Sequence, residues 1–434
     1  MGPLEDLTNL RQALYQCTEL RAEALNERDR RDWQVDVFEE EDDPISELME
    51  RISWHQQGAV ALGLAGGSGV GKTTQVFRLI DRLWTSEGIR GIRVGYENYS
   101  SLSSAPDITD FLLSIIGGLA EEAGRLGYLR AGWTPAETEN ELISLLRRLK
   151  FEPEITAGPL KIKASLRDDE TFRRRLREHL SGQVAQFVRE VREFASHLVL
   201  EIVKNSPGCR GVAMIVDSTE RLSAPASAEE EMRTAVRSLF IQNAENLEFS
   251  DLNCIYLLPP WLPISDGGAL RLDTVAFPTV RVAKRDDEDD ERGLALLDSI
   301  VRKRMPEINA LISTPDLRQL YRMSGGVQRV LFLLLKEVAG RARRAKSLPV
   351  PQEIVRTALD SVRQDYLAIT IEAAPALRRI DATKSVDGLE EKSLDQLGRY
   401  FQALVVLQVA NGEKWYTIHP LMRQRLNSVP MPAT

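Results

Sequence analysis

The sequence predicts an α/β fold built on a parallel β-sheet. A short apolar run, GAVALGLAGG (58–67), leads into a glycine-rich loop, and a helical pattern that stops at Gly88 follows it. A second apolar run lies in GIRVGYENYS (91–100). Strand, loop, helix and strand in this order are typical of a βαβ unit, which joins two parallel strands. Further apolar runs at 211–217 and 252–258 extend the predicted sheet.

The residues before the sheet predict a separate N-terminal helical segment at 1–43. Residues 4–30 have the charged, amphipathic pattern of one helix, with leucines along its apolar side. The acidic run EEEDDP (39–44) closes this region, and Pro44 opens a second helix that runs to about Gln57. The leucines of the first helix are Leu4, Leu7, Leu10, Leu14 and Leu20.

A helical insertion is predicted between the second and third strands, at about 105–207. Its charged stretch 169–205 has the pattern of one continuous helix. The last strand of the sheet is expected at 278–283, so the α/β core is expected to span 44–285. A helical lid is expected at 286–369.

The C-terminal residues 370–434 predict a winged-helix domain. Helical patterns near 372–383 and 391–403 precede two β-rich runs. Asn411-Gly412 between those runs is a strong signal for a tight hairpin turn. Two helices followed by a hairpin are the order of a winged helix.

A phosphate-binding loop follows the first strand. GGSGVGKTT (66–74) matches the pattern GxxxxGK[ST]. Glycines let successive backbone N–H groups point at one anion, and the following helix adds the positive end of its dipole. Lys72 is expected to reach the β- and γ-phosphates of ATP, and the Thr73 hydroxyl to coordinate Mg²⁺. The core is therefore predicted to be a P-loop NTPase. Its predicted ATP-binding residues are Gly66, Gly67, Ser68, Gly69, Val70, Gly71, Lys72, Thr73 and Thr74.

The run GVAMIVDSTERL (211–222) places Asp217 at the carboxyl end of a strand, where ligands bind in open α/β sheets. Asp217 is therefore expected to hold the magnesium ion beside Thr73. Ser218 stands where many ATPases carry a second, water-activating acid, so Glu220 becomes the candidate catalytic base. The alternative for Glu220 is a surface acid that pairs with a neighbouring arginine or caps a helix. Without a base, hydrolysis should be slow and the protein should act as a nucleotide-operated switch.

In this order the motifs resemble those of AAA+ and STAND P-loop ATPases, over roughly residues 44–425. MSGGVQRVLFLLL resembles the sensor 2 helix of origin-recognition-like ATPases, and the resemblance implies that Arg329 senses the γ-phosphate. CIYLLPPWLP resembles the sensor 1 strand, although Pro259 and Pro260 stand where a polar residue is common. The acid of DSTE lies three residues past Asp217, an arrangement closer to that of STAND ATPases. The predicted C-terminal winged helix is shared with STAND and origin-recognition-like ATPases.

Four arginines are candidates for fingers that reach a neighbouring subunit. Arg302 and Arg304 lie on a predicted lid helix, and Arg233 and Arg237 lie on the helix before the sensor 1 strand. Spacing alone does not distinguish a finger from a solvated arginine.

The net charge of −8 argues against a surface coated for nucleic acid. Two basic runs, 173–177 and 341–346, are either solvated helix faces or a track for a phosphate backbone. The run KRDDEDDER (284–292) holds six consecutive acids and is expected to be an exposed linker between core and lid. The predicted recognition helix of the winged helix is nearly neutral, which favours protein contacts or autoinhibition over DNA binding.

Several features argue against a membrane protein and against a metal site built from Cys and His. No apolar run approaches the roughly 18 residues that span a bilayer, and the acidic N-terminus is not a signal peptide, so a cytoplasmic protein is expected. Gly2 is not a predicted myristoylation site, because Asp6 stands where Ser or Thr is required. The three cysteines and four histidines are dispersed, which predicts no metal site built from them.

These patterns predict an ATPase that binds Mg-ATP, hydrolyses it slowly, forms homo-oligomers and controls a separate effector protein. The family resemblance further implies a bacterial conflict setting, such as anti-phage defence. Two alternatives stay open. One is a DNA-associated AAA+ ATPase of the replication-initiator or transposon-targeting type, and the other is a scaffold with a vestigial nucleotide site.

Overall fold

A computed structural model describes residues 43–54, 58–152, 161–306, 308–411 and 413–430, together with residues 35 and 38. It divides into two compact units. The sheet unit comprises Pro44–Ala65 and Gln75–Ala276, and the loop–lid unit comprises Met1–Asp43, Gly66–Thr74 and Phe277–Thr434. The helix predicted at 4–30 lies outside the described residues, and the boundaries of the four segments predicted from the sequence remain predictions.

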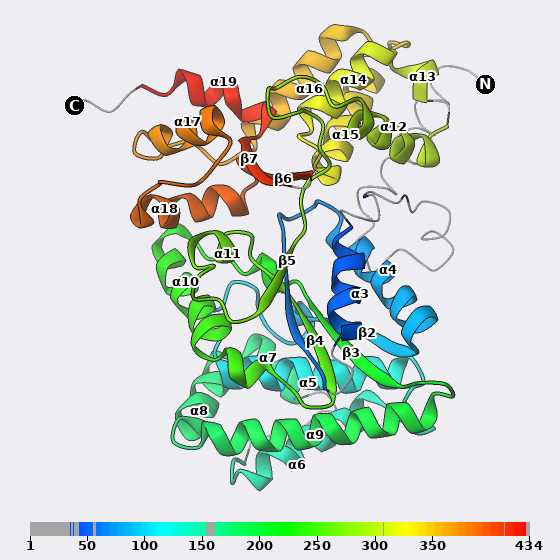
Figure 1. Ribbon diagram of the computed structural model, residues 1–434, viewed down its shortest axis with the longest axis vertical. Coiled ribbons are helices and arrows are strands. Elements are labelled where there is room, and N and C mark those ends of the chain that lie inside the picture. The colour runs from blue at the N-terminus through cyan, green and yellow to red at the C-terminus, as the bar shows by residue number, and fades with distance from the viewer. Residues whose placement is uncertain are drawn as a thin grey trace. The chain divides into compact units, whose positions relative to one another are not determined.

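The sheet unit is built on a five-stranded parallel sheet, which confirms the predicted α/β fold (Figure 1). The strand order is β2-β3-β4-β1-β5. Because all neighbouring strands run parallel, their carboxyl ends lie along one edge, and this edge includes both Ala65 and Asp217. The strands are β1 (Ala61–Ala65), β2 (Ile89–Gly95), β3 (Gly211–Asp217), β4 (Leu252–Leu258) and β5 (Asp273–Ala276).

The central strands are apolar and buried, as expected for parallel strands covered on both faces. Residues 212–216 of β3 have no exposed surface. The helices of this unit include α3 (Pro44–Trp54), α4 (Lys72–Arg82), which starts in the other unit, α10 (Glu229–Arg237) and α11 (Leu262–Ser265). The insertion between β2 and β3 comprises α5 (Ile108–Arg125), α6 (Pro135–Arg148), α7 (Lys161–Asp168), α8 (Glu170–Leu180) and α9 (Val184–Asn205).

The expectation of one continuous helix at 169–205 is wrong. The chain breaks between α8 and α9, where the Gln183 N–H bonds to the Leu180 carbonyl. Gly182 lies in this break, and glycine is one of the poorest helix formers. The break lets α8 pack on α5 and α7 while α9 packs on α5 and β3.

The strand expected at 278–283 is also wrong. The last strand of the sheet, β5, ends at Ala276, two residues before Pro278. Proline has no N–H to donate to a neighbouring strand, so pairing stops here. Residues 279–283 instead make two isolated pairings within the loop–lid unit, Thr279 with Val409 and Ala283 with Asp289.

The loop–lid unit is mainly helical and ends in a hairpin. Its helices are α12 (Glu291–Arg304), α13 (Ile308–Leu311), α14 (Thr314–Met323), α15 (Gln328–Ala345), α16 (Gln352–Gln364), α17 (Ala374–Thr383) and α18 (Glu391–Gln402). The antiparallel hairpin of β6 (Val406–Asn411) and β7 (Glu413–Ile418) confirms that the two predicted β-rich runs pair. It is followed by α19 (Pro420–Ser428), which the sequence analysis did not predict.

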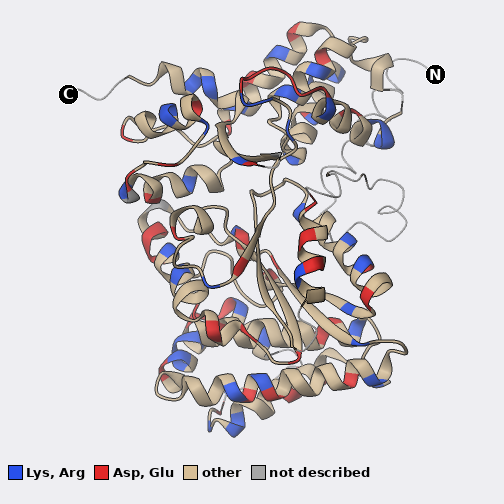
Figure 2. Cartoon of the chain, in the orientation of Figure 1, with Lys and Arg blue, Asp and Glu red and all other residues tan. Residues whose placement is uncertain are grey.

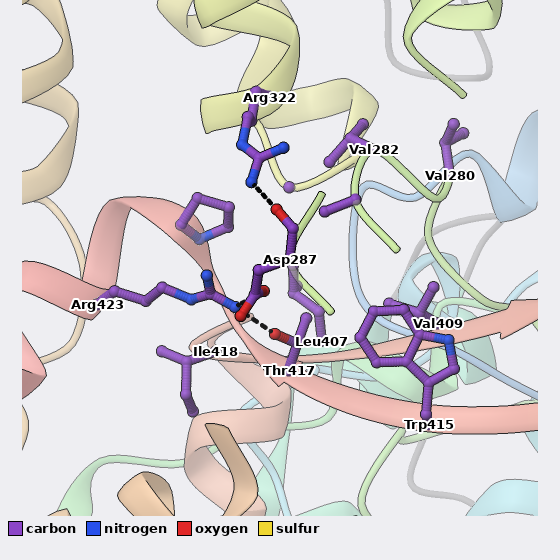
Figure 3. Close-up of a pocket in the computed structure, with 13 residues that line it drawn as sticks. Val280, Val282, Asp287, Arg322, Leu407, Val409, Trp415, Thr417, Ile418 and Arg423 are labelled. Atoms are coloured by element: carbon purple, nitrogen blue, oxygen red, sulfur yellow. Dashed lines mark hydrogen bonds and ion pairs between the residues drawn. The ribbon is translucent and has the colours of Figure 1, made fainter. Parts of the chain in front are cut away.

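Most residues of the acidic run 284–292 are exposed, as expected, but Asp287, Asp289 and Asp290 are tied to basic side chains. The Asp287 carboxylate forms ion pairs with Arg423 (2.6 Å) and Lys384 (3.1 Å), and Figure 3 shows the pair with Arg423. Asp289 pairs with Arg318 (2.6 Å). Figure 2 shows basic residues beside the acidic ones of this run. The sequence pattern missed these partners because they come from α14, from the residue that caps the end of α17 and from α19, up to 136 residues away.

Asp290 has a different role, because it is buried and caps α12. Its carboxylate accepts the Gly293 N–H (2.9 Å) and the Arg281 Nε–H (2.6 Å). An acid at this position stabilises the first turn of a helix in two ways. It accepts from N–H groups that have no partner within the helix, and its negative charge interacts favourably with the helix dipole.

Candidate nucleotide-binding site

The phosphate loop continues directly from β1, and α4 begins at Lys72. Gly69 (φ +83°) and Gly71 (φ +104°) have backbone angles that only glycine adopts without strain. The Lys72 ammonium donates to the carbonyl oxygens of Gly66 (2.9 Å) and Gly67 (2.7 Å), and the side chain is 3% exposed. In this structure two carbonyls of the loop therefore hold the Lys72 ammonium.

The first residues of α15 lie against this loop in the loop–lid unit. The Arg329 backbone N–H donates to the Gly69 carbonyl (3.1 Å), and its Nη1 donates to Ser68 Oγ (2.9 Å). A methyl group at Gly69 would come within 2.6 Å of Arg329 Cβ, and one at Gly71 within 3.1 Å of Gln328 Nε2. The predicted sensor Arg329 is thus beside the loop, and Gln328, which the sequence analysis missed, is beside it too.

Leu404 also contacts the phosphate loop. A methyl group at Gly67 would come within 2.4 Å of Leu404 Cδ2. The backbone of Leu404 has φ +59°, which is a genuine outlier for a bulky residue and marks local strain. No sequence pattern signals a leucine in this conformation, so this contact could not be found from the sequence.

Asp217 lies at the carboxyl end of β3 in the sheet unit and is 1% exposed. Its Oδ1 accepts the Ser218 N–H (2.8 Å) and its Oδ2 accepts the Arg93 Nε–H (2.6 Å). Ser218 has φ +76°, a conformation that is rare outside glycine and that gathers at functional sites. Arg93, on the neighbouring strand β2, was not among the predicted site residues.

Glu220 lies in a single 3₁₀ turn, Thr219–Arg221, directly after β3. The hydroxyl of Thr219 donates to the Leu257 carbonyl and fixes this turn to β4. Glu220 is 5% exposed, so the alternative of a surface acid is wrong. Thr73, the other predicted magnesium ligand, is half-buried at the start of α4.

The arginine-finger candidates make contacts within their own units. Arg233 and Arg237 both face the ring of Trp261, with Arg233 also paired to Glu229 (2.9 Å) and Arg237 to Asp266 (3.0 Å). Arg233 is buried, so it is not a solvated arginine.

In the loop–lid unit, Arg302 pairs with Asp298 and Arg304 lies over the Phe332 ring. At the sensor 1 position, β4 runs into buried Pro259 and Pro260.

The basic run 173–177 is not a continuous solvated face. Arg173 is buried and donates to the carbonyls of residues 166 and 167, while Arg177 pairs with Asp110. Only Arg174 and Arg175 of these arginines are exposed. In the other run, Arg341 pairs with Glu337, and Arg343, Arg344 and Lys346 are exposed.

Among the described residues, none of the helices combines the length and the apolar character that crossing a membrane requires. Within the same ranges, no group of three or more His, Cys, Asp or Glu side chains is arranged to hold a metal ion.

His419 is fully buried where β7 meets α19. Its Nδ1 accepts the Leu421 N–H (3.3 Å), so the proton of the neutral ring lies on Nε2, which is 3.1 Å from the Ser324 carbonyl and 3.0 Å from the Tyr366 hydroxyl. Burial lowers the pKa of His419 to about 3. The ring therefore joins α19 to the turn that precedes α15.

This burial predicts a loss of stability in mild acid. In the unfolded chain His419 takes up a proton below its ordinary pKa of 6.5, whereas the folded protein resists protonation down to about pH 3. Stability is therefore full above pH 6.5 and is lost as the pH falls, by about 2 kcal/mol at pH 5. Denaturant unfolding at pH 7.5 and pH 5 measures this loss. His419→Gln should lose correspondingly less, and an equal loss in both proteins would contradict the assignment.

The parallel sheet with a GxxxxGK[ST] loop after β1 defines a P-loop NTPase fold. No family model matches the chain, and no curated protein matches it in sequence. Solved structures similar to it include the Cdc6 protein of Pyrobaculum aerophilum, at 12% identity over 92% of this chain and 95% of that chain, with a TM-score of 0.39.

Two further structures are similar to the same extent. The ORC2 protein of Aeropyrum pernix in its ADP form has 12% identity over 92% of this chain and 96% of that chain, with a TM-score of 0.41. A Walker-type ATPase of Pyrococcus abyssi has 14% identity over 93% and 97%, with a TM-score of 0.40.

Proposed function

We propose that this protein binds Mg-ATP and acts as a slowly hydrolysing regulatory switch. The observation that carries the proposal is the phosphate loop itself. Two of its glycines adopt left-handed angles, two of its carbonyls accept from the Lys72 ammonium, and α15 contacts it through Arg329. A nucleotide phosphate would draw Lys72 away from the loop carbonyls, so binding would change the contacts of a loop that α15 touches.

The residues present fit a magnesium nucleotide. Backbone N–H groups of residues 66–74 and the start of α4 would hold the phosphates. The Thr73 hydroxyl and the Asp217 carboxylate are the hard oxygen ligands that Mg²⁺ prefers. Magnesium, when bound, neutralises charge on the phosphate oxygens. Arg329, which bonds Ser68, would sense the γ-phosphate.

Glu220 is the proposed base that activates water. A positioned base contributes about 10²–10⁴-fold to a reaction rate, so Glu220→Gln should lower phosphate release by at least about 100-fold. Glu231→Gln, an exposed acid of the same sheet unit, is the matched control and should keep the wild-type rate. Equal turnover of wild type and Glu220→Gln would remove Glu220 from this role.

Self-assembly and control of an effector protein complete the proposal. An ordered set of motifs similar to those of AAA+ and STAND ATPases, with a predicted C-terminal winged helix, supports a homo-oligomer that responds to nucleotide and acts in bacterial anti-phage defence. Sizing of the same samples with and without ATP tests it. A mass that is unchanged by nucleotide would overturn nucleotide-dependent assembly.

A further inference from the structure

The ion pair between Arg93 and Asp217 occupies the carboxylate that the proposed metal site needs. Arg93 Nε lies 2.6 Å from Asp217 Oδ2, and the two side chains are 14% and 1% exposed. Arg93 is also 3.7 Å from Glu97, in the turn that follows β2. A guanidinium paired with a carboxylate this deeply buried balances a charge that would otherwise be costly to bury.

The register of the sheet explains how Arg93 reaches Asp217. Gly95 of β2 lies directly opposite Asp217 of β3. Arg93 is two residues earlier, so its side chain is on the same face as position 95. Gly95 has no side chain, and a Cβ there would come within 2.9 Å of Asn98 Nδ2 and 3.2 Å of Glu97 Oε2. Arg93 thus reaches Asp217 along the diagonal of the two strands, a separation that long side chains bridge.

We propose that Arg93 competes with magnesium for Asp217 and thereby sets how strongly nucleotide binding depends on the metal. The inference rests on the proposed function. A dication placed at this carboxylate would stand close to the guanidinium and be repelled by it, because charges interact strongly away from bulk water. Arg93 must therefore leave Oδ2 before Asp217 can serve the metal. It is a positioning residue that acts through Asp217.

A purely structural role for the pair predicts something different. If Arg93 only joins β2 to β3, removing it would weaken the fold equally with and without metal. If it competes with magnesium, its removal leaves a buried carboxylate that the metal can neutralise. Mg-ATP should then raise the melting temperature of the variant more than that of the wild type.

The test is calorimetric titration of ATP into the full chain, once with EDTA and once with Mg²⁺. The measured quantity is the ratio of the dissociation constant in EDTA to that in Mg²⁺. For Arg93→Gln this ratio should rise about tenfold over the wild type, the effect of one repelling charge near the metal. Arg93→Lys keeps the charge and should stay close to the wild type. Arg90→Gln removes an equal charge from the same strand, away from Asp217, and should leave the ratio unchanged.

The outcomes separate this inference from the proposed function. If the wild type binds ATP and Arg93→Gln has the same ratio, or a lower one, the competition does not exist although the function stands. If the wild type binds no ATP in either buffer, both are overturned. Should Arg93→Gln not fold, Arg93→Met takes its place, since it removes the charge and keeps a side chain of similar length. Its ratio should also rise about tenfold, and a ratio equal to or below that of the wild type would overturn the inference.

Discussion

Lys72→Ala is expected to weaken ATP binding by about 100-fold, because a hydrogen bond to a charged group is worth about 1.5–3 kcal/mol. The variant loses the ammonium that would meet the phosphates and that in this structure donates to the carbonyls of Gly66 and Gly67. Titration with a fluorescent ATP analogue measures the affinity.

The control for Lys72→Ala is Lys204→Ala, an exposed lysine at the end of α9. It makes the same change of net charge and should bind as the wild type does. If Lys72→Ala bound ATP as tightly as the wild type, the loop would not hold nucleotide. The alternative of a scaffold with a vestigial nucleotide site would then describe the protein better.

Gly326→Ala is expected to destabilise the loop–lid unit by about 2–5 kcal/mol, the sum of a left-handed backbone penalty and an overpacked contact. Gly326 has φ +77°, and a methyl group there would come within 1.7 Å of the Val280 carbonyl oxygen. It lies in the turn between α14 and α15. Since that turn places Gln328 and Arg329 beside the phosphate loop, the variant should also lose nucleotide affinity.

Gly340→Ala supplies the matched control for this prediction. Gly340 lies inside α15, and a methyl group there would meet nothing closer than 3.7 Å. Alanine should therefore stabilise the helix by up to about 1 kcal/mol. Thermal unfolding of both variants gives the comparison. If Gly326→Ala melts at or above the temperature of Gly340→Ala, the backbone of this turn is not constrained as described.

The parts of the fold that could be predicted are those where local pattern and tertiary structure agree. The strands 211–217 and 252–258 are apolar and bounded by polar residues, and the structure has them at the same residues. Gly88 ends the helical stretch after the phosphate loop through a left-handed cap, as its position suggested. Asn411-Gly412 likewise gave the hairpin, because its turn chemistry is local.

The rest depended on contacts between distant residues. Nothing near Arg93 in the sequence shows that it faces Asp217, 124 residues later. The charges of Arg173 and Arg233 suggested solvent, but both side chains are buried against partners that other segments supply. The prediction of a strand at 278–283 was wrong for a simpler reason. The apolar residues of this segment are buried without joining the sheet.

The acidic run has a consequence for how this sequence can evolve. Asp287 is tied to Lys384 and Arg423, which lie 97 and 136 residues further along the chain. Loss of one charge leaves the others in excess, so a substitution at position 287 is tolerated best when a distant position changes with it. A stretch that looks like low-complexity sequence is thus under long-range constraint, and homologous chains should show its acids and their cations varying as sets.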